Sequence, residues 1–252
     1  MRTLNSTLSM LPHIPGLDYY GDCQPAGDVG GDFFDFVPDR TNDLVMTVGD
    51  VSGHDREAAM LMSFVQTLLH SLAAQPHGAI SEVVHELNRA VCRVSPDHFF
   101  VTLFCAAFDP RSRELHYTSA GHEPALLVRN HGGRAIRLES TGTVLGLTTR
   151  AVYGQRRIGL EPGDVLVAFT DGVTEATDSQ GRELRDIGIL QVVREYPYAS
   201  STELVGRIMD AAGRFAGQAP PADDRTVAVV RFMGPADARI GAEAAEMAFA
   251  AA

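Results

Sequence analysis

The sequence predicts an α+β fold in which a sheet core carries paired helices on its outside. Three observations support this prediction. Short apolar runs separated by turn residues recur along the chain, as is typical of strands. Apolar residues with helical spacing occupy two stretches after the first strands and two more before the last strand. The middle of the chain resembles a series of antiparallel hairpins.

The predicted strands are apolar or alternating runs bounded by turn residues. They cover residues 17–24, 32–37, 43–50, 99–108, 114–120, 124–130, 134–139, 152–159, 164–170 and 226–232. Turns rich in Gly, Pro and Asp separate the central strands at 109–112, 131–133 and 161–164. This arrangement indicates successive antiparallel hairpins.

Four helices are predicted, at about 56–75, 80–94, 185–195 and 201–216. The first has one apolar face formed by Ala58, Met62, Val65, Leu69 and Leu72. Asp55 is well placed to be its N-cap. Residues 236–252 are rich in Ala and Glu and are expected to form a short helix or a frayed tail.

The order of elements shows no internal repeat and no linker. We therefore expect one domain over residues 17–233, preceded by a lead-in segment, 1–16, and followed by a C-terminal tail, 234–252.

Composition excludes several classes of protein. The formal net charge is -11 and basic residues are scattered, which argues against nucleic-acid binding. The three cysteines lie far apart and predict neither a disulfide framework nor a CxxC metal site, which fits a cytoplasmic location. No signal-peptide core and no stretch of about 18 apolar residues is present, so no membrane span is expected.

Four acidic clusters lie at the ends of predicted strands. Asp32 begins one strand, Asp50 and Asp171 end two others, and residues 223–224 begin the last. Converging carboxylates repel one another and are stable together only when protonated or when cations lie between them. Two Mg²⁺ or Mn²⁺ ions could occupy such a site, hold a phosphate and activate a bridging water. Each cluster taken alone is explained equally well by an ordinary turn.

Asp171 has two further interpretations, as a nucleophile or as a metal ligand. Aspartyl-phosphate hydrolases of the haloacid dehalogenase type carry the attacking Asp in a DxDG signature after a strand. Here the position two residues before Asp171 is Phe169, so the attacking carboxylate is missing. Metal ligand is the better interpretation of Asp171.

Six segments, in order along the chain, resemble the motifs of one family. They are LPHIPGLDYYGDCQPAGDVGGDFFDF, VGDVSGHDREAAMLM, TSAGHEPALL, TGTVLGL, LEPGDVLVAFTDGVTEATDSQGREL and ADDRTVAVVRF. Over about residues 10–233 the chain resembles the SpoIIE/RsbU branch of the PPM (type 2C) metal-dependent Ser/Thr protein phosphatases. The resemblance implies a four-layer αββα sandwich of two antiparallel sheets flanked by helix pairs.

The resemblance also implies two Mn²⁺ or Mg²⁺ ions at one end of the sandwich. On the matching positions, Asp50 would bridge both ions and the Val51 carbonyl would bind one of them. Asp171 and Asp223 would complete the set, and Asp32 would hold a metal-bound water.

Asp224 is adjacent to Asp223 and is the alternative ligand. Aligning the closing motif on Thr226 favours Asp223.

The activity implied by the resemblance is hydrolysis of phosphoserine or phosphothreonine by water activated between the ions. The expected substrate is a phosphorylated STAS-type anti-sigma-factor antagonist in bacterial partner-switching signalling. The alternative is a binding module that kept the fold and lost turnover. The intact set of Asp50, Asp171 and Asp223 argues against this alternative.

Departures from the family pattern leave alternatives open. His54 either donates a proton to the leaving oxygen or fixes its loop. Asp55 stands where the family usually has glycine, and either caps the following helix or tunes activity through its charge. Arg185 stands where a glycine is common. Only about fifteen residues precede Leu17, so regulation is expected from a protein partner, from a homodimer, or from tilting of the helix pair 56–94.

Overall fold

The computed structural model describes residues 13–27, 30–38, 43–53, 56–75, 78–95, 99–217 and 221–234. Its strands are β1 (Leu17–Gln24), β2 (Asp32–Pro38), β3 (Leu44–Val51), β4 (Val101–Asp109), β5 (Glu114–Ala120), β6 (Ala125–Val128), β7 (Ala135–Leu138), β8 (Arg156–Gly159), β9 (Val165–Phe169) and β10 (Arg225–Phe232). Its helices are α1 (Arg56–Ala73), α2 (Ile80–Val94), α3 (Asp171–Thr174), α4 (Arg185–Glu195) and α5 (Ser201–Ala216).

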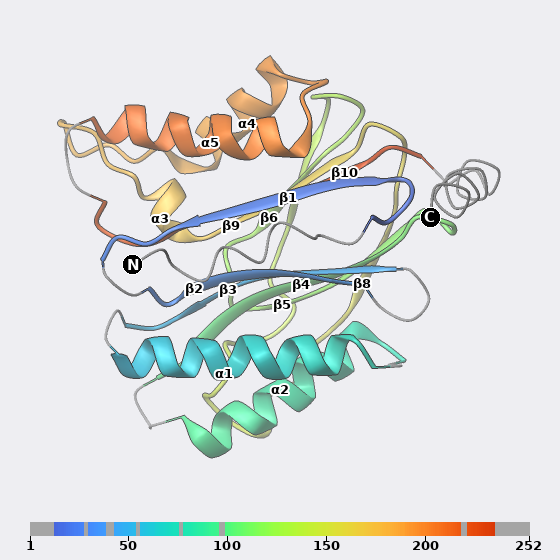
Figure 1. Cartoon of the computed structure of the whole chain (residues 1–252), viewed down its shortest axis with the longest axis vertical. Helices are drawn as coiled ribbons and strands as arrows, with labels where there is room; N and C mark the ends of the chain where they lie inside the picture. The colour runs from blue at the N-terminus through green and yellow to red at the C-terminus, as the bar shows by residue number, and fades with distance from the viewer. Residues whose placement is uncertain are drawn as a thin grey trace, which may run out of the picture.

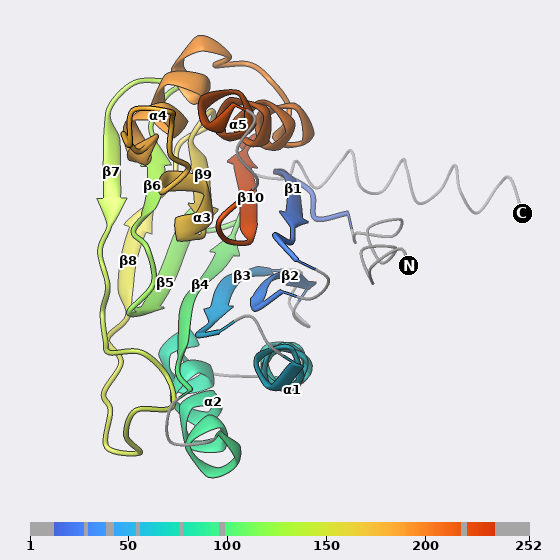
Figure 2. The ribbon, with the colours of Figure 1, turned by 90° about the vertical axis from the view of Figure 1, so that its left-hand side faces the viewer.

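The strands form two five-stranded antiparallel sheets that stack face to face. The first sheet has the order β1-β10-β9-β6-β7 and the second has the order β2-β3-β4-β5-β8. Helix α5 packs on β1 and β10 with α4 beside it, and α1 and α2 cover the outer face of the second sheet (Figure 1). Figure 2 shows the two helix pairs on opposite sides of the stacked sheets. These four layers confirm the predicted αββα sandwich.

The inner faces of the two sheets enclose a buried apolar cluster. Met46 and Phe104 come from the second sheet, and Leu127, Leu166 and Val230 from the first. Each fully buried side chain of this size contributes roughly 1.5–3 kcal/mol to folding. This packing holds the two sheets against each other and so fixes where their strand ends meet.

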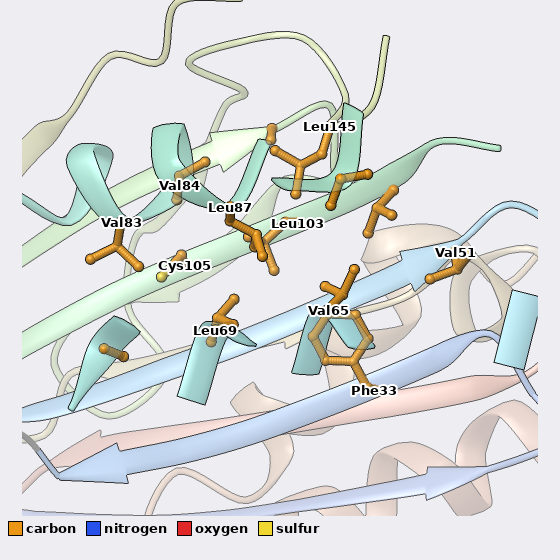
Figure 3. Close-up of a cluster of buried hydrophobic side chains, with 14 of the residues drawn as sticks. Phe33, Val51, Val65, Leu69, Val83, Val84, Leu87, Leu103, Cys105 and Leu145 are labelled. Carbon is orange, nitrogen blue, oxygen red and sulfur yellow. The ribbon is translucent and has the colours of Figure 1, made fainter. Parts of the chain in front are cut away.

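A second cluster lies between the second sheet and its two helices (Figure 3). Val65 and Leu69 of α1 and Leu87 of α2 pack there with Leu103 of β4. A third cluster, beneath α4 and α5, buries residues of β9 and β10 on their outer side. Strands β9 and β10 are therefore covered on both faces, which explains their unbroken apolar runs.

The helix predictions are confirmed with small shifts at the ends. The buried side chains of α1 follow one stripe: Ala58, Leu61, Val65, Leu69 and Ala73. Met62 and Leu72, expected on that face, lie partly buried at its edge. Helix α5 starts with a capping box in which Ser200 and Glu203 satisfy each other's backbone N–H groups.

One local prediction was wrong, and one short element was missed. The strand expected over 152–159 is confined to Arg156–Gly159, because Tyr153 is turned into the core against α2 and the Gly154 N–H donates to the Thr141 carbonyl. The short helix α3, directly after β9, was not predicted. The segment expected to form a short helix or a frayed tail, 236–252, lies outside the described residues. Among the described helices, none combines the length and apolar character needed to cross a membrane.

Candidate metal centre

Both sheets bring acidic strand ends to the same end of the sandwich. In the second sheet Asp32 of β2 is the direct cross-strand partner of Asp50 of β3. In the first sheet Asp171 follows β9 and begins α3, which packs against β10 (Figure 1). Acids that lie more than a hundred residues apart in the sequence therefore meet at one site.

Asp50 and Asp171 line one small cavity of about 80 Å³. Its other lining residues are Thr102, Gly121, His122, Glu123 and Thr170. A water occupies about 30 Å³ in the liquid, so this cavity has room for small ions, waters or a phosphoryl group. It is far smaller than the roughly 300–1,000 Å³ of a typical cofactor pocket.

The carboxylates of this site destabilise one another's charge. Burial, followed by the charges of Asp171, Asp223 and Asp224, raises the pKa of Asp50 to about 7. Burial and then the Asp223 charge raise the pKa of Asp171. Burial and then the Asp171 charge also raise the pKa of Glu123. Positive charge between these groups would relieve the repulsion, so the acids fit divalent cations.

The acids face one another without forming a closed ligand shell. Within the described ranges, no group of three or more His, Cys, Asp or Glu side chains is gathered closely enough to hold an ion. Mg²⁺ usually keeps several waters and takes one or two carboxylates. Asp50 and Asp171, which both line the cavity, match this small number of protein carboxylates.

The adjacent residues Asp223 and Asp224 face different surroundings. Asp223 is exposed, and its charge acts on both Asp50 and Asp171. Asp224 is only 5% exposed, and its two oxygens accept backbone N–H groups of Ala26 (2.7 Å) and Gly31 (2.8 Å). Asp223 uses only Oδ1 in this way, to accept the Asp224 N–H (2.8 Å), so Asp223 is more open than Asp224 to an ion.

Glycines allow the connection between β1 and β2 to approach the site closely. A Cβ on Gly30 would lie 2.1 Å from the Asp224 carboxylate, and one on Gly31 would lie 2.5 Å from the Val51 carbonyl oxygen. The Val51 N–H in turn donates to the Gly31 carbonyl (3.2 Å). Residue 31 thus links Asp224 of one sheet to the backbone of Val51 in the other.

A glycine is required at position 172 because the backbone of Asp224 passes close to it. A Cβ there would lie 2.0 Å from the backbone oxygen of Asp224. We expect Gly172→Ala to lower the free energy of unfolding by about 1–3 kcal/mol, as is usual for overpacking, measured by urea denaturation. Gly206→Ala is the matched control, because no atom lies within 4 Å of its added Cβ. Gly206 lies inside α5, so its replacement should instead stabilise by about 0.5–1 kcal/mol. Equal effects of the two substitutions would contradict this account of Gly172.

Asp32 is held from behind by two hydroxyl groups. Its Oδ2 accepts hydrogen bonds from Thr170 and Thr226, each at 2.7 Å. Burial and the Asp50 charge raise the pKa of Asp32 well above its usual range, and the two hydroxyl donors oppose this shift. Neither threonine was predicted to have a role at the site. The available signal was that each stands within two residues of an acid in its motif, in TDG and in DDRT.

His122 is a buried partner of the cavity wall. Its Nδ1 lies 2.8 Å from the Thr102 hydroxyl, and Thr102 is the cross-strand neighbour of Asp50. Burial lowers the pKa of His122 to about 4, so the ring is neutral near pH 7. A neutral, almost completely buried ring fits a structural role in the cavity wall.

Three sequence predictions around the site have different outcomes. His54 and Asp55 lie outside the described residues, so their roles stay predictions. Arg185 has a φ of 59°, in the left-handed region that favours glycine. The departure from the family pattern at this position therefore places an exposed side chain where the backbone suits glycine.

Comparisons with known proteins show the family and agree with the fold. The family model described as Stage II sporulation protein E (SpoIIE) matches residues 40–233. The phosphoserine phosphatase RsbU of Bacillus subtilis is 32% identical over 203 residues, covering 80% of this chain and 59% of RsbU. The chain thus spans little more than half the length of that relative.

Solved structures share the fold. The crystal structure of the RsbU and RsbW domains of a Mycobacterium tuberculosis protein has a TM-score of 0.75 and 28% identity, over 89% of this chain and 62% of that one. RsbX, crystallised in complex with magnesium, has a TM-score of 0.64 and 16% identity, over 85% and 94% of the two chains. At that identity, the second likeness concerns the fold alone.

Proposed function

Because the chain belongs to the Stage II sporulation protein E family, we propose that it is a metal-dependent phosphatase acting on phosphoserine or phosphothreonine of a regulatory protein. One observation carries the proposal. Asp50 and Asp171, from different sheets, line one small cavity in which burial and like charge raise both pKa values. A cavity that needs cations and has room for a phosphoryl group suits phosphate-ester hydrolysis.

The described residues suggest how two Mn²⁺ or Mg²⁺ ions would be held. Asp50 and the Val51 carbonyl would be ligands from the second sheet. Asp171 and Asp223 would complete the protein ligands, whereas Asp224 would hold the β1–β2 connection in place. When bound, the ions supply positive charge for the phosphoryl oxygens and make a water nucleophilic near neutral pH.

Three further residues have roles other than supplying the main ligands of the ions. Asp32, turned toward Asp50 and anchored from behind, would orient water at the edge of the centre. His54 follows the strand that carries Asp50, and we propose that it either donates a proton to the leaving oxygen or fixes its loop. Phe169, buried at the end of β9, occupies the position where a DxDG phosphatase carries its nucleophilic Asp. That carboxylate is therefore not present to form a phospho-enzyme.

We propose a phosphorylated STAS-type anti-sigma-factor antagonist as the substrate, within cytoplasmic partner-switching signalling. Similarity to RsbU and to the structure that combines RsbU and RsbW domains supports this class. The small cavity also agrees with a protein substrate that inserts only its phosphoryl group. Regulation by a protein partner, by a homodimer or by the α1–α2 pair stays a prediction.

Metal removal tests the proposed function. We expect EDTA to abolish hydrolysis of p-nitrophenyl phosphate and of a phosphorylated STAS protein, and added Mn²⁺ or Mg²⁺ to restore it. Calorimetry should show two ions bound per chain. Turnover that persists in EDTA would overturn the metal-dependent mechanism. A chain that binds two ions but hydrolyses neither substrate would favour the binding module instead.

A further inference from the structure

The carboxylate of Asp32 joins the two sheets at the site. Asp32 belongs to β2 of the second sheet, whereas its two hydroxyl partners belong to the first, where Thr170 follows β9 and Thr226 lies within β10. All three residues are nearly or fully enclosed, with exposed fractions of 7% for Asp32, 1% for Thr170 and 0% for Thr226. Buried hydrogen bonds to a carboxylate are about twice as strong as those between neutral groups.

The direction of the Thr170 hydrogen bond is fixed by the backbone. The Thr170 hydroxyl oxygen accepts the Thr226 N–H at 3.0 Å. Because a threonine hydroxyl carries one hydrogen, that hydrogen is available for Asp32 Oδ2, which accepts it at 2.7 Å. Oδ2 is thus occupied by two donors. Among the described residues, none donates a hydrogen bond to the other oxygen, Oδ1.

We infer that Thr170 and Thr226 are positioning residues, which fix Asp32 so that one oxygen is anchored in the protein and the other is left for the metal centre. The inference rests on the proposed function, because it concerns how Asp32 is presented to the ions. The same two bonds also hold the end of β2 against β9 and β10. The ligands supplied by the two sheets are thereby kept at a fixed separation.

Other threonines in the same sheets show that buried hydroxyls here do not require such partners. The hydroxyls of Thr47 and Thr118 are buried without a hydrogen-bond partner among the described residues. Thr226 differs from them because its hydroxyl meets a carboxylate from the opposite sheet. Thr47 therefore supplies a matched control for removing a buried hydroxyl.

The test uses Thr226→Val, which keeps the shape and removes the hydroxyl. Replacement of Thr170 is less suitable, because it would also leave the Thr226 N–H without its acceptor. We expect Thr226→Val to weaken Mn²⁺ binding by about 10–100-fold, as is typical when a ligand-orienting partner is lost. Calorimetry measures the Mn²⁺ affinity without any need for turnover. The value of kcat/KM for p-nitrophenyl phosphate should fall in parallel. Thr226→Ser should restore both, and Thr47→Val should leave both at the wild-type value.

The outcomes separate this inference from the proposed function. A wild-type chain that neither binds Mn²⁺ nor hydrolyses phosphate esters would overturn both. A wild-type chain that does both, with an unchanged Mn²⁺ affinity for Thr226→Val, would overturn the positioning role alone. A loss in Thr226→Val that Thr226→Ser does not rescue would also overturn it, because packing would then be the cause. Melting curves, recorded for each variant, ensure that all are compared while folded.

Discussion

Asp171→Asn is expected to lower kcat/KM for p-nitrophenyl phosphate in Mn²⁺ by on the order of 10²–10³-fold, the usual cost of removing one electrostatic stabiliser from a site. The substitution keeps the size of the side chain and removes its charge. Asp171 lines the same cavity as Asp50 and begins α3 at the end of β9. Loss of this carboxylate should weaken ion binding, because Asp171 is the proposed ligand that the end of β9 contributes opposite Asp50. Steady-state kinetics and Mn²⁺ calorimetry measure the effect.

Asp210→Asn controls for the loss of an acid. Asp210 lies on the outside of α5, and its side chain is 73% exposed. The control should keep wild-type kinetics and Mn²⁺ affinity. Wild-type activity in Asp171→Asn would remove Asp171 from the proposed ligands. Equal losses in both variants would point to net charge instead of a specific ligand.

Asp223→Asn and Asp224→Asn are expected to have opposite dominant effects although they are neighbours. Asp223 is exposed, so its replacement should change the free energy of unfolding by less than about 0.5 kcal/mol while lowering Mn²⁺ affinity. Asp224→Asn leaves one acceptor oxygen where two backbone N–H groups need one each. A buried donor left without a partner costs about 1–3 kcal/mol, so this variant should lose stability. Urea denaturation without metal and Mn²⁺ calorimetry separate the two effects.

Each member of this pair serves as the control for the other. Both variants lose one negative charge at nearly the same point of the chain. If Asp224→Asn keeps full stability and loses Mn²⁺ affinity, Asp224 is the ligand and the assignment is reversed. If both lose affinity to the same extent, the two acids share the ions.

Much of the fold could be predicted because its signals are local. Apolar runs, turn residues and the stripe on α1 depend on residues close together in the sequence, and most predicted elements were confirmed. The shortened β8 could not be predicted, because Tyr153 leaves the strand to fill a gap beside α2. That gap exists only once α2 and the sheet have come together.

The acids at strand ends were also visible in the sequence, but their different environments were not. Asp223 and Asp224 carry the same local signal, and β10 is buried at every position, so alternation cannot tell which acid turns inward. Asp224 turns inward because the backbone N–H groups of residues 26 and 31, almost two hundred positions away, donate to its carboxylate. The anchoring of Asp32 by Thr170 and Thr226 is likewise a contact between sheets, which only the assembled sandwich reveals.

The short outer strands have a consequence for solubility. Strands β7 and β8 end their sheets, and each is only four residues long. β7 carries Arg137, and β8 carries Arg156 and Arg157. Short edges that bear charge are poor templates for adding a strand from another molecule. The sandwich can therefore stay open along this side, without closing into a barrel, and still resist edge-to-edge aggregation.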